Sequence, residues 1–223
     1  MTLLKIIIVL LQVIVNHHHH NKRLLMIPIH RRKLDLNLSQ LKHNCNFVYK
    51  QIIDEIAIPN QEIDTKHTSI PTAVSQYYNL FTSIMPGMFE LQRDIRNEFK
   101  NNIPHDESLE YWIVGWLNYW PKQGTTLTWH GHEYGDDDNC FHGYLGVQCE
   151  PSQTIYRNIG EEALEIAVEN KNGQLVITNS KGVEHMTSDW KQDDPRITIA
   201  FNIQPRETVL QEVGNKLNYY VGL

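Results

Sequence analysis

Residues 195–203, Pro-Arg-Ile-Thr-Ile-Ala-Phe-Asn-Ile, indicate a β-strand that lines a polar site. Successive side chains of a strand point to opposite faces, so Arg196 and Thr198 share one face. An arginine amid apolar neighbours needs an acidic partner, because an unpaired buried charge is costly. A guanidinium fork beside a hydroxyl suits the two-pronged binding of a carboxylate. We therefore predict that this strand binds an acidic ligand.

Three histidines precede that strand at a spacing typical of a metal site. His130 and His132 stand in Trp-His-Gly-His-Glu at residues 129–133, and His185 lies 53 residues after His132. Alternate residues of a strand face the same way, so the close pair can offer two imidazoles to one ion. Three protein ligands leave coordination positions open for substrate, cosubstrate or oxygen. The sequence thus predicts a metal centre made of His130, His132 and His185.

The sequence from Ser108 onward predicts an all-β half. Aromatic and β-branched residues dominate it, and turn-forming clusters separate them. We expect strands at 109–120, 125–130, 141–149, 154–157, 174–178 and 197–203. Several short strands separated by turns favour a sandwich or barrel. A jelly roll is such a fold, and it builds metal sites from two close ligands and one distant ligand.

The sequence before Ser108 is mostly helical in pattern. Residues 36–39, Leu-Asn-Leu-Ser, offer N-cap chemistry before a helix expected to run to about Ile58. A second helical pattern covers 71–99, where apolar residues recur at steps of three and four. Pro86-Gly87 must kink or break that helix. We therefore predict an α+β fold, a double-stranded β-helix (jelly roll) with supporting N-terminal helices.

The expected organisation is one domain with short flanking segments. Of 223 residues, we assign 1–24 to an apolar and His-rich leader without stable structure and 25–108 to the helical part. Residues 109–206 form the catalytic core and 207–223 a C-terminal tail. The apolar run at 3–15 is shorter than the roughly 20 residues that span a bilayer, so we expect no membrane segment, although the run leaves an anchor open.

The composition excludes some classes of partner. The net charge of −6 argues against sequence-independent binding of nucleic acid, which favours a basic surface. Three scattered cysteines are too few for a disulfide framework, so we expect a reducing, cytoplasmic compartment. These features indicate a protein whose partners are small molecules. The composition indicates neither the primary substrate nor the oligomeric state.

The stretch 116–205 resembles the Fe(II)- and 2-oxoglutarate-dependent oxygenase superfamily, especially its prolyl-hydroxylase-like and phage-type branches. The pair at His130 and His132 resembles the family's paired ligands, and His185 resembles its distal histidine. Arg196 followed by Thr198 resembles the family's cosubstrate-binding motif. The resemblance implies an Fe(II) enzyme that uses 2-oxoglutarate as cosubstrate, hydroxylates a substrate and releases succinate and CO2.

Further residues are candidates for cosubstrate contacts. Tyr144 shares a strand face with His142 and would offer its hydroxyl to the cosubstrate if that face points inward. Asn118, on the strand that leads into the site, is either a cosubstrate contact or a structural hydrogen-bonding residue. His142 is either a fourth residue of the site or a packing residue between strands.

One position departs from the family pattern and leaves alternatives open. The usual ligand two residues after the first histidine is Asp or Glu, and this chain has His132 there. Either three imidazoles bind the metal, or a carboxylate such as Glu133 or Asp136 reaches it. The spacing of residues 124–143 also resembles the first cupin motif, so a cupin-type metal enzyme that does not use 2-oxoglutarate is an alternative. A non-catalytic jelly-roll binding or structural module is another.

Overall fold

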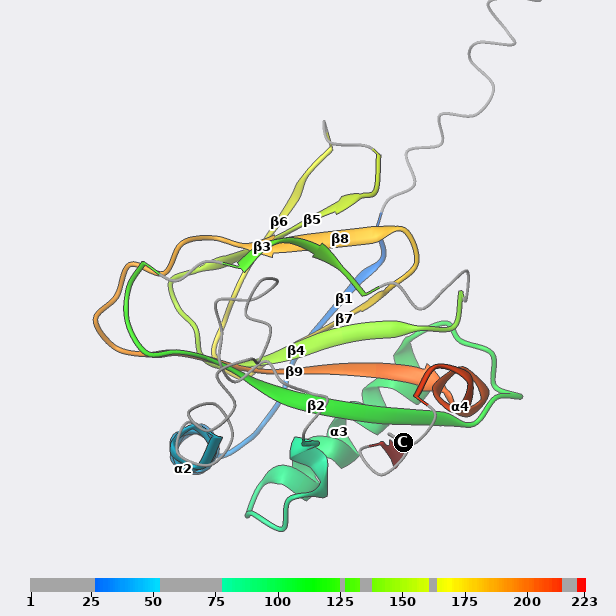
Figure 1. The fold of residues 1–223 in the computed structure, drawn as a ribbon, viewed down its shortest axis with the longest axis horizontal. Helices are drawn as coiled ribbons and strands as arrows, with labels where there is room; N and C mark the ends of the chain where they lie inside the picture. The colour runs from blue at the N-terminus through cyan, green and yellow to red at the C-terminus, as the bar shows by residue number, and fades with distance from the viewer. Residues whose placement is uncertain (1–26, 53–77, 125–126, 133–137, 161–163, 214–219) are drawn as a thin grey trace, which may run out of the picture.

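The computed structural model of the protein describes residues 27–52, 78–124, 127–132, 138–160, 164–213 and 220–223. Two sheets built from antiparallel pairs face each other, with helices on the outer side of the larger one (Figure 1). This arrangement confirms the expected α+β class and the double-stranded β-helix.

The strands divide six to four between the two sheets. In spatial order, the larger sheet contains β1 (Ile29–Lys33), β7 (Gln174–Asn179), β4 (Phe141–Gln148), β9 (Arg196–Pro205), β2 (Tyr111–Trp120) and β10 (Val221–Gly222). The smaller sheet contains β3 (Leu127–Gly131), β8 (Val183–Thr187), β5 (Gln153–Asn158) and β6 (Ile166–Glu169). Neighbouring strands are distant in sequence, because the chain passes repeatedly from one sheet to the other.

The described helical elements are α2 (Leu38–Ile52), the short 3₁₀ helix η2 (Leu80–Thr82), α3 (Met88–Asn102) and α4 (Arg206–Val213). Asn37 caps α2, since its Oδ1 accepts the Gln40 backbone N–H at 3.0 Å. Helix α3 begins directly after Gly87, whose φ of 87° only glycine adopts readily, and this confirms the predicted break at Pro86-Gly87. The expected end of α2 near Ile58 lies outside the described residues.

Some elements differ from the sequence-based expectations. Strand β1 lies in the segment expected to be mostly helical, and α4 occupies part of the expected tail. Strands β6, β8 and β10 also escaped prediction. β1 pairs along its whole length with β7, from Ile29 opposite Thr178 to Lys33 opposite Gln174. A long-range pairing of this kind fixes a strand that its own sequence, Ile-His-Arg-Arg-Lys, does not specify by alternation. The domain boundaries themselves stay a prediction.

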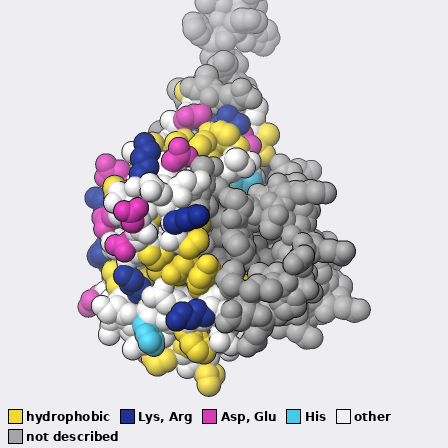
Figure 2. All heavy atoms as spheres, turned by 60° about the vertical axis from the view of Figure 1, so that its left-hand side comes forward, with side chains coloured by type: hydrophobic (Ala, Val, Ile, Leu, Met, Phe, Trp, Pro, Cys, Tyr) yellow, Lys and Arg dark blue, Asp and Glu magenta, His cyan; other side chains and the backbone are white. Residues whose placement is uncertain are grey.

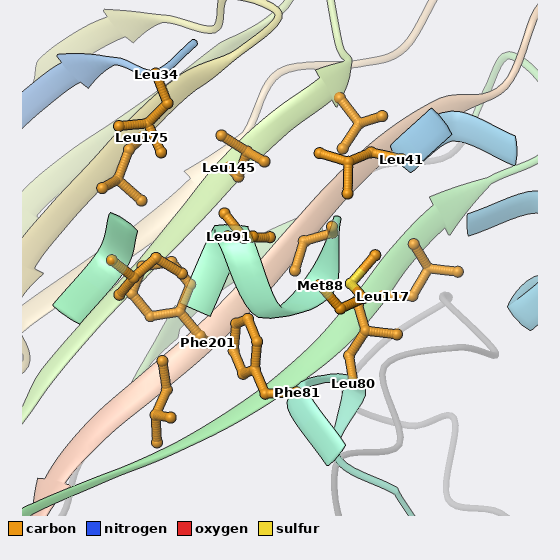
Figure 3. Packing of buried hydrophobic residues seen from close by; sticks show 14 of the residues in the cluster. Leu34, Leu41, Leu80, Phe81, Met88, Leu91, Leu117, Leu145, Leu175 and Phe201 are labelled. Atoms are coloured by element: carbon orange, nitrogen blue, oxygen red, sulfur yellow. The ribbon is translucent and has the colours of Figure 1, made fainter. Parts of the chain in front are cut away.

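The larger hydrophobic core lies between the six-stranded sheet and the helices. Helix α3 presents Met88, Leu91, Ile95 and Phe99 to it, and all four are at most 1% exposed. Figure 3 shows Met88 and Leu91 packed among leucines and phenylalanines of the helices and the sheet. This core confirms the predicted apolar face of the second helix and holds the larger sheet in place beneath the site.

The second core lies between the two sheets, and β9 shows how the sequence separates the two environments. Ile197, Ile199, Phe201 and Ile203 belong to the helix-side core. The alternate residues of β9 face the other way, and one of them, Ala200, belongs to the core between the sheets. The period of two along this strand therefore directs Arg196 and Thr198 into the space between the sheets.

The surface carries charges of both signs. On the face in Figure 2, Lys and Arg side chains alternate with Asp and Glu, and the part of that face the structure describes shows no continuous basic stripe. The predicted leader lies outside the described residues. Within the described ranges, no helix is both long and apolar enough to cross a membrane.

Candidate metal centre

Strand pairing brings the three predicted histidines together. His130 of β3 lies directly opposite His185 of β8, and their ring centroids are 4.3 Å apart. His132 follows the end of β3, with its ring 5.5 Å from that of His130 and 5.2 Å from that of His185. One nitrogen from each imidazole lies within 4.8 Å of the others. Three imidazoles at this separation could bind a single ion.

The larger sheet closes the cluster from the opposite side. His142 of β4 stacks on His132 at 4.5 Å and on His185 at 4.9 Å, with its Nδ1 3.1 Å from Ser180 Oγ. Trp116 of β2 stacks on the other neighbour, His132, at 6.0 Å. His142 is therefore a residue of the site as well as a packing residue between the sheets.

Burial keeps the cluster neutral. It lowers the pKa of His132 to about 3, helped by the nearby His130. Burial also lowers the pKa of His130, and it lowers those of His142 and His185 well below the usual value. Metal binding requires unprotonated imidazoles, because the lone pair must be free. The cluster is thus in a metal-binding protonation state at neutral pH.

Hydrogen bonding orients the rings for a metal. His130 Nδ1 lies 2.8 Å from the backbone carbonyl of Thr128, so this nitrogen donates its hydrogen and leaves Nε2 free. His185 Nδ1 is buried and has no hydrogen-bond partner within the described part of the chain. Buried polar atoms are normally paired. An ion bound between the rings would fit this donor set.

The carboxylate alternatives remain untested. Glu133 and Asp136 lie outside the described residues. Among the described residues, the group that can hold an ion consists of histidines alone. The neighbouring Glu184 is bound elsewhere, since it forms an ion pair with Arg157.

Arg196 occupies the same inner wall as a buried cation. Its side chain is 3% exposed, its guanidinium lies 4.5 Å above the ring of Trp120, and its Nε donates to Ser152 Oγ at 3.2 Å. Burial lowers its pKa. Within the described chain no carboxylate lies within 4.0 Å of it, so its charge is not neutralised by an ion pair. Such a guanidinium favours an anionic ligand.

The strand register gathers the other candidates around Arg196. Thr198 lies between Asn118 of β2 and Gly146 of β4, and Tyr144 of β4 lies opposite Ala200. Asn118 Oδ1 accepts a hydrogen bond from the indole N–H of Trp116 at 3.1 Å. The Tyr144 hydroxyl donates to Asn170 Oδ1 at 2.5 Å. Burial raises the pKa of Tyr144 to about 12.

A groove of about 790 Å³ lies beside the histidine cluster. Thr178, which lines it, pairs with His142, and Val183, which also lines it, stands two residues before His185. The wall is mainly apolar, and Ile159 and Ile27 contribute to it. The groove therefore offers an approach to the cluster for a partly apolar molecule.

Solved structures with the same architecture cover most of this chain. A prolyl-4-hydroxylase from Pseudomonas putida has 12% identity and a TM-score of 0.52, over 81% of this chain and 94% of that one. EctD from S. alaskensis, in a structure with 2-oxoglutarate and 5-hydroxyectoine, has 13% identity and a TM-score of 0.54, over 82% and 73%.

A third is a prolyl hydroxylase from Trichoplax adhaerens in complex with a hypoxia inducible factor peptide fragment. It has 10% identity and a TM-score of 0.53, over 90% of this chain and 96% of that one. The chain has the double-stranded β-helix fold of the 2-oxoglutarate oxygenases. Identity this low establishes the fold alone. No family model and no curated protein matches the sequence.

Within this oxygenase fold, sequence reasoning missed the polar residues behind Arg196. Ser152 and Asn170 follow turns, and neither belongs to a motif with Arg196 in the linear sequence. Asn170 is 2% exposed, and a buried asparagine at the end of a short strand gives no periodic signal. Only the pairing of the strands brings these two side chains to Arg196.

Proposed function

We propose that the protein is an Fe(II)- and 2-oxoglutarate-dependent dioxygenase that hydroxylates a substrate with release of succinate and CO2. The carrying observation is that Arg196, a buried cation without an acid partner among the described residues, shares one enclosed space with the three-histidine cluster. The fold, shared with a protein whose structure contains 2-oxoglutarate, supports the proposal.

Each candidate residue has a distinct task under this proposal. His130, His132 and His185 hold Fe(II), which would supply the activation of dioxygen. Arg196 binds the far carboxylate of 2-oxoglutarate, and Thr198 offers a hydroxyl beside it. We assign Tyr144 and Asn118 to the wall of the cosubstrate pocket.

The apolar residues between the sheets keep bulk water from the reacting groups. Trp116, Tyr156 and Ala200 are all at most 8% exposed. Electrostatic attraction between Arg196 and a carboxylate is stronger in such surroundings than in water. The primary substrate would approach through the groove lined by Thr178 and Val183.

Succinate formation tests the proposal. Untagged protein loaded with Fe(II) should convert 2-oxoglutarate to succinate and CO2 in the presence of oxygen, slowly without a primary substrate. His185→Ala should abolish this conversion. Absence of succinate from the loaded wild-type protein, with each candidate primary substrate class supplied, would count against the assignment.

A cupin-type metal enzyme is the second candidate, and the all-imidazole cluster favours it. None of the described members of the ion-binding group is a carboxylate. This candidate predicts a bound metal together with indifference to 2-oxoglutarate. A non-catalytic module predicts no bound metal at all.

A further inference from the structure

Asn170 connects the two cosubstrate candidates that lie on different strands. Its side chain, 2% exposed, follows the end of β6. Its Oδ1 accepts the Tyr144 hydroxyl at 2.5 Å and the Thr154 hydroxyl at 2.9 Å, and its Nδ2 donates to Ser152 Oγ at 2.8 Å. One amide thus joins three hydroxyl groups around the inner wall.

Ser152 carries this connection to the guanidinium. Its Oγ accepts hydrogen bonds from Asn170 Nδ2 and from Arg196 Nε, and donates to the Cys149 carbonyl at 2.6 Å. A hydroxyl has one hydrogen and two lone pairs, so all its capacity is used. A continuous chain of hydrogen bonds therefore runs from Tyr144 through Asn170 and Ser152 to Arg196.

Backbone contacts hold the turn that carries Asn170 against β4. Gly146 has no room for a side chain, because a Cβ there would lie 2.3 Å from the Lys171 carbonyl oxygen. The Gly173 N–H donates to the Gly146 carbonyl at 2.6 Å, and the Asn170 N–H donates to the Ser152 carbonyl at 2.9 Å. The position of Asn170 is thus fixed without its side chain, so its amide is free to orient other groups.

The chain determines which atoms face a ligand. Arg196 is held at Nε, so the Nη groups at the end of the fork remain for an acid, with no carboxylate within 4.0 Å among the described residues. Tyr144 gives its only hydroxyl hydrogen to Asn170 and so offers an oxygen lone pair rather than a donor. A carboxylate is therefore directed to the guanidinium end.

We infer that Asn170 and Ser152 are positioning residues that set the place of Arg196 and thereby the length of 2-oxo diacid that the site accepts. This inference rests on the proposed function. A guanidinium held at one nitrogen and stacked on Trp120 has a fixed distance to the histidine cluster. A diacid must match that distance, because its two ends are bound at once.

Direct titration of 2-oxoglutarate and the one-carbon-longer 2-oxoadipate into metal-loaded protein tests the inference. Asn170→Ala and Ser152→Ala should each weaken 2-oxoglutarate binding about tenfold or more and reduce the preference for it over 2-oxoadipate. The double variant should lose little more than either single variant, because both changes break one chain. Ser152→Thr, which keeps the hydroxyl, should restore binding.

Asn172→Ala is the matched control. Its Oδ1 accepts the Cys149 N–H at 2.8 Å in the same turn, yet it has no printed contact with Arg196 or Tyr144, so binding should stay at the wild-type level. Unchanged affinity and unchanged diacid preference in both Asn170→Ala and Ser152→Ala would overturn the inference while leaving the proposed function standing. A wild-type protein that binds neither diacid would overturn both. If Asn170→Ala does not fold, Ser152→Ala decides between these results.

Discussion

His130 of β3 and His185 of β8 lie directly opposite each other, with ring centroids 4.3 Å apart. The smaller sheet alone therefore sets the distance between two of the three proposed ligands. His132, just past the end of β3, completes the triad from the same strand. The triad is thus built on paired backbone, and it should be specific and sensitive to single substitutions.

Removal of His185 should abolish metal binding. His185→Ala deletes one of three ligands and leaves a buried gap, so we expect Fe(II) affinity to fall at least 100-fold. Anaerobic titration with Fe(II), followed by metal analysis of the gel-filtered protein, measures this. His43→Ala, which changes an exposed histidine on α2, should bind metal like the wild type. Stoichiometric metal in His185→Ala would contradict the assignment of this ligand.

Removal of the Arg196 charge should affect the cosubstrate far more than the metal. Truncating one member of a buried charge pair costs about 2–5 kcal/mol, so we expect Arg196→Ala to raise the KM for 2-oxoglutarate about 30-fold or more. Its metal affinity should not change. Arg206→Ala is a matched control, because Arg206 also lies over a tryptophan, 5.7 Å from the Trp112 ring, but at the surface. Equal effects of the two substitutions would refute the role of Arg196.

The metal-free protein should lose stability as the pH falls below about 6.5. The folded-state pKa of His132, about 3, lies below its ordinary value of 6.5. Between these two values the unfolded state binds more protons, so the free energy of unfolding rises with pH in that range. Thermal unfolding at pH 7, 6 and 5 measures the slope. His132→Gln removes this group and should show a shallower slope, whereas an identical slope would argue against a neutral buried imidazole there.

The helix-side core should dominate the stability of the fold. Phe201 is 0% exposed and packs edge-to-face on Phe81, with centroids 6.4 Å apart. We expect Phe201→Ala to lower the free energy of unfolding by about 3–5 kcal/mol, measured by urea denaturation. Phe89→Ala, at a position 71% exposed, should change it by less than about 0.5 kcal/mol. Similar losses in the two variants would contradict the placement of this core.

Local sequence patterns predicted the parts of the fold that depend on local interactions. The apolar face of α3 and the alternation along β9 both follow from periodicity, and Gly87 marks the start of α3. Strand β1 could not be predicted in this way, because its partner β7 lies about 140 residues away.

The same distinction holds within the site. The spacing of the histidines and of Arg196 indicated a metal centre and a carboxylate site. The sequence gave no sign of Asn170 or Ser152, since their link to Arg196 exists only once three separate segments pack together. His142 was a weak candidate for the same reason, because its neighbours come from the opposite sheet.

Calorimetric titration of 2-oxoglutarate into the metal-loaded and the metal-free protein, without oxygen, tests most directly whether the histidine cluster and Arg196 form one site. A ligand bound at both ends should bind much more tightly to the metal-loaded protein, and both His185→Ala and Arg196→Ala should lose that tight binding. Binding of equal strength with and without metal, or tight binding retained in Arg196→Ala, would contradict a shared 2-oxoglutarate site.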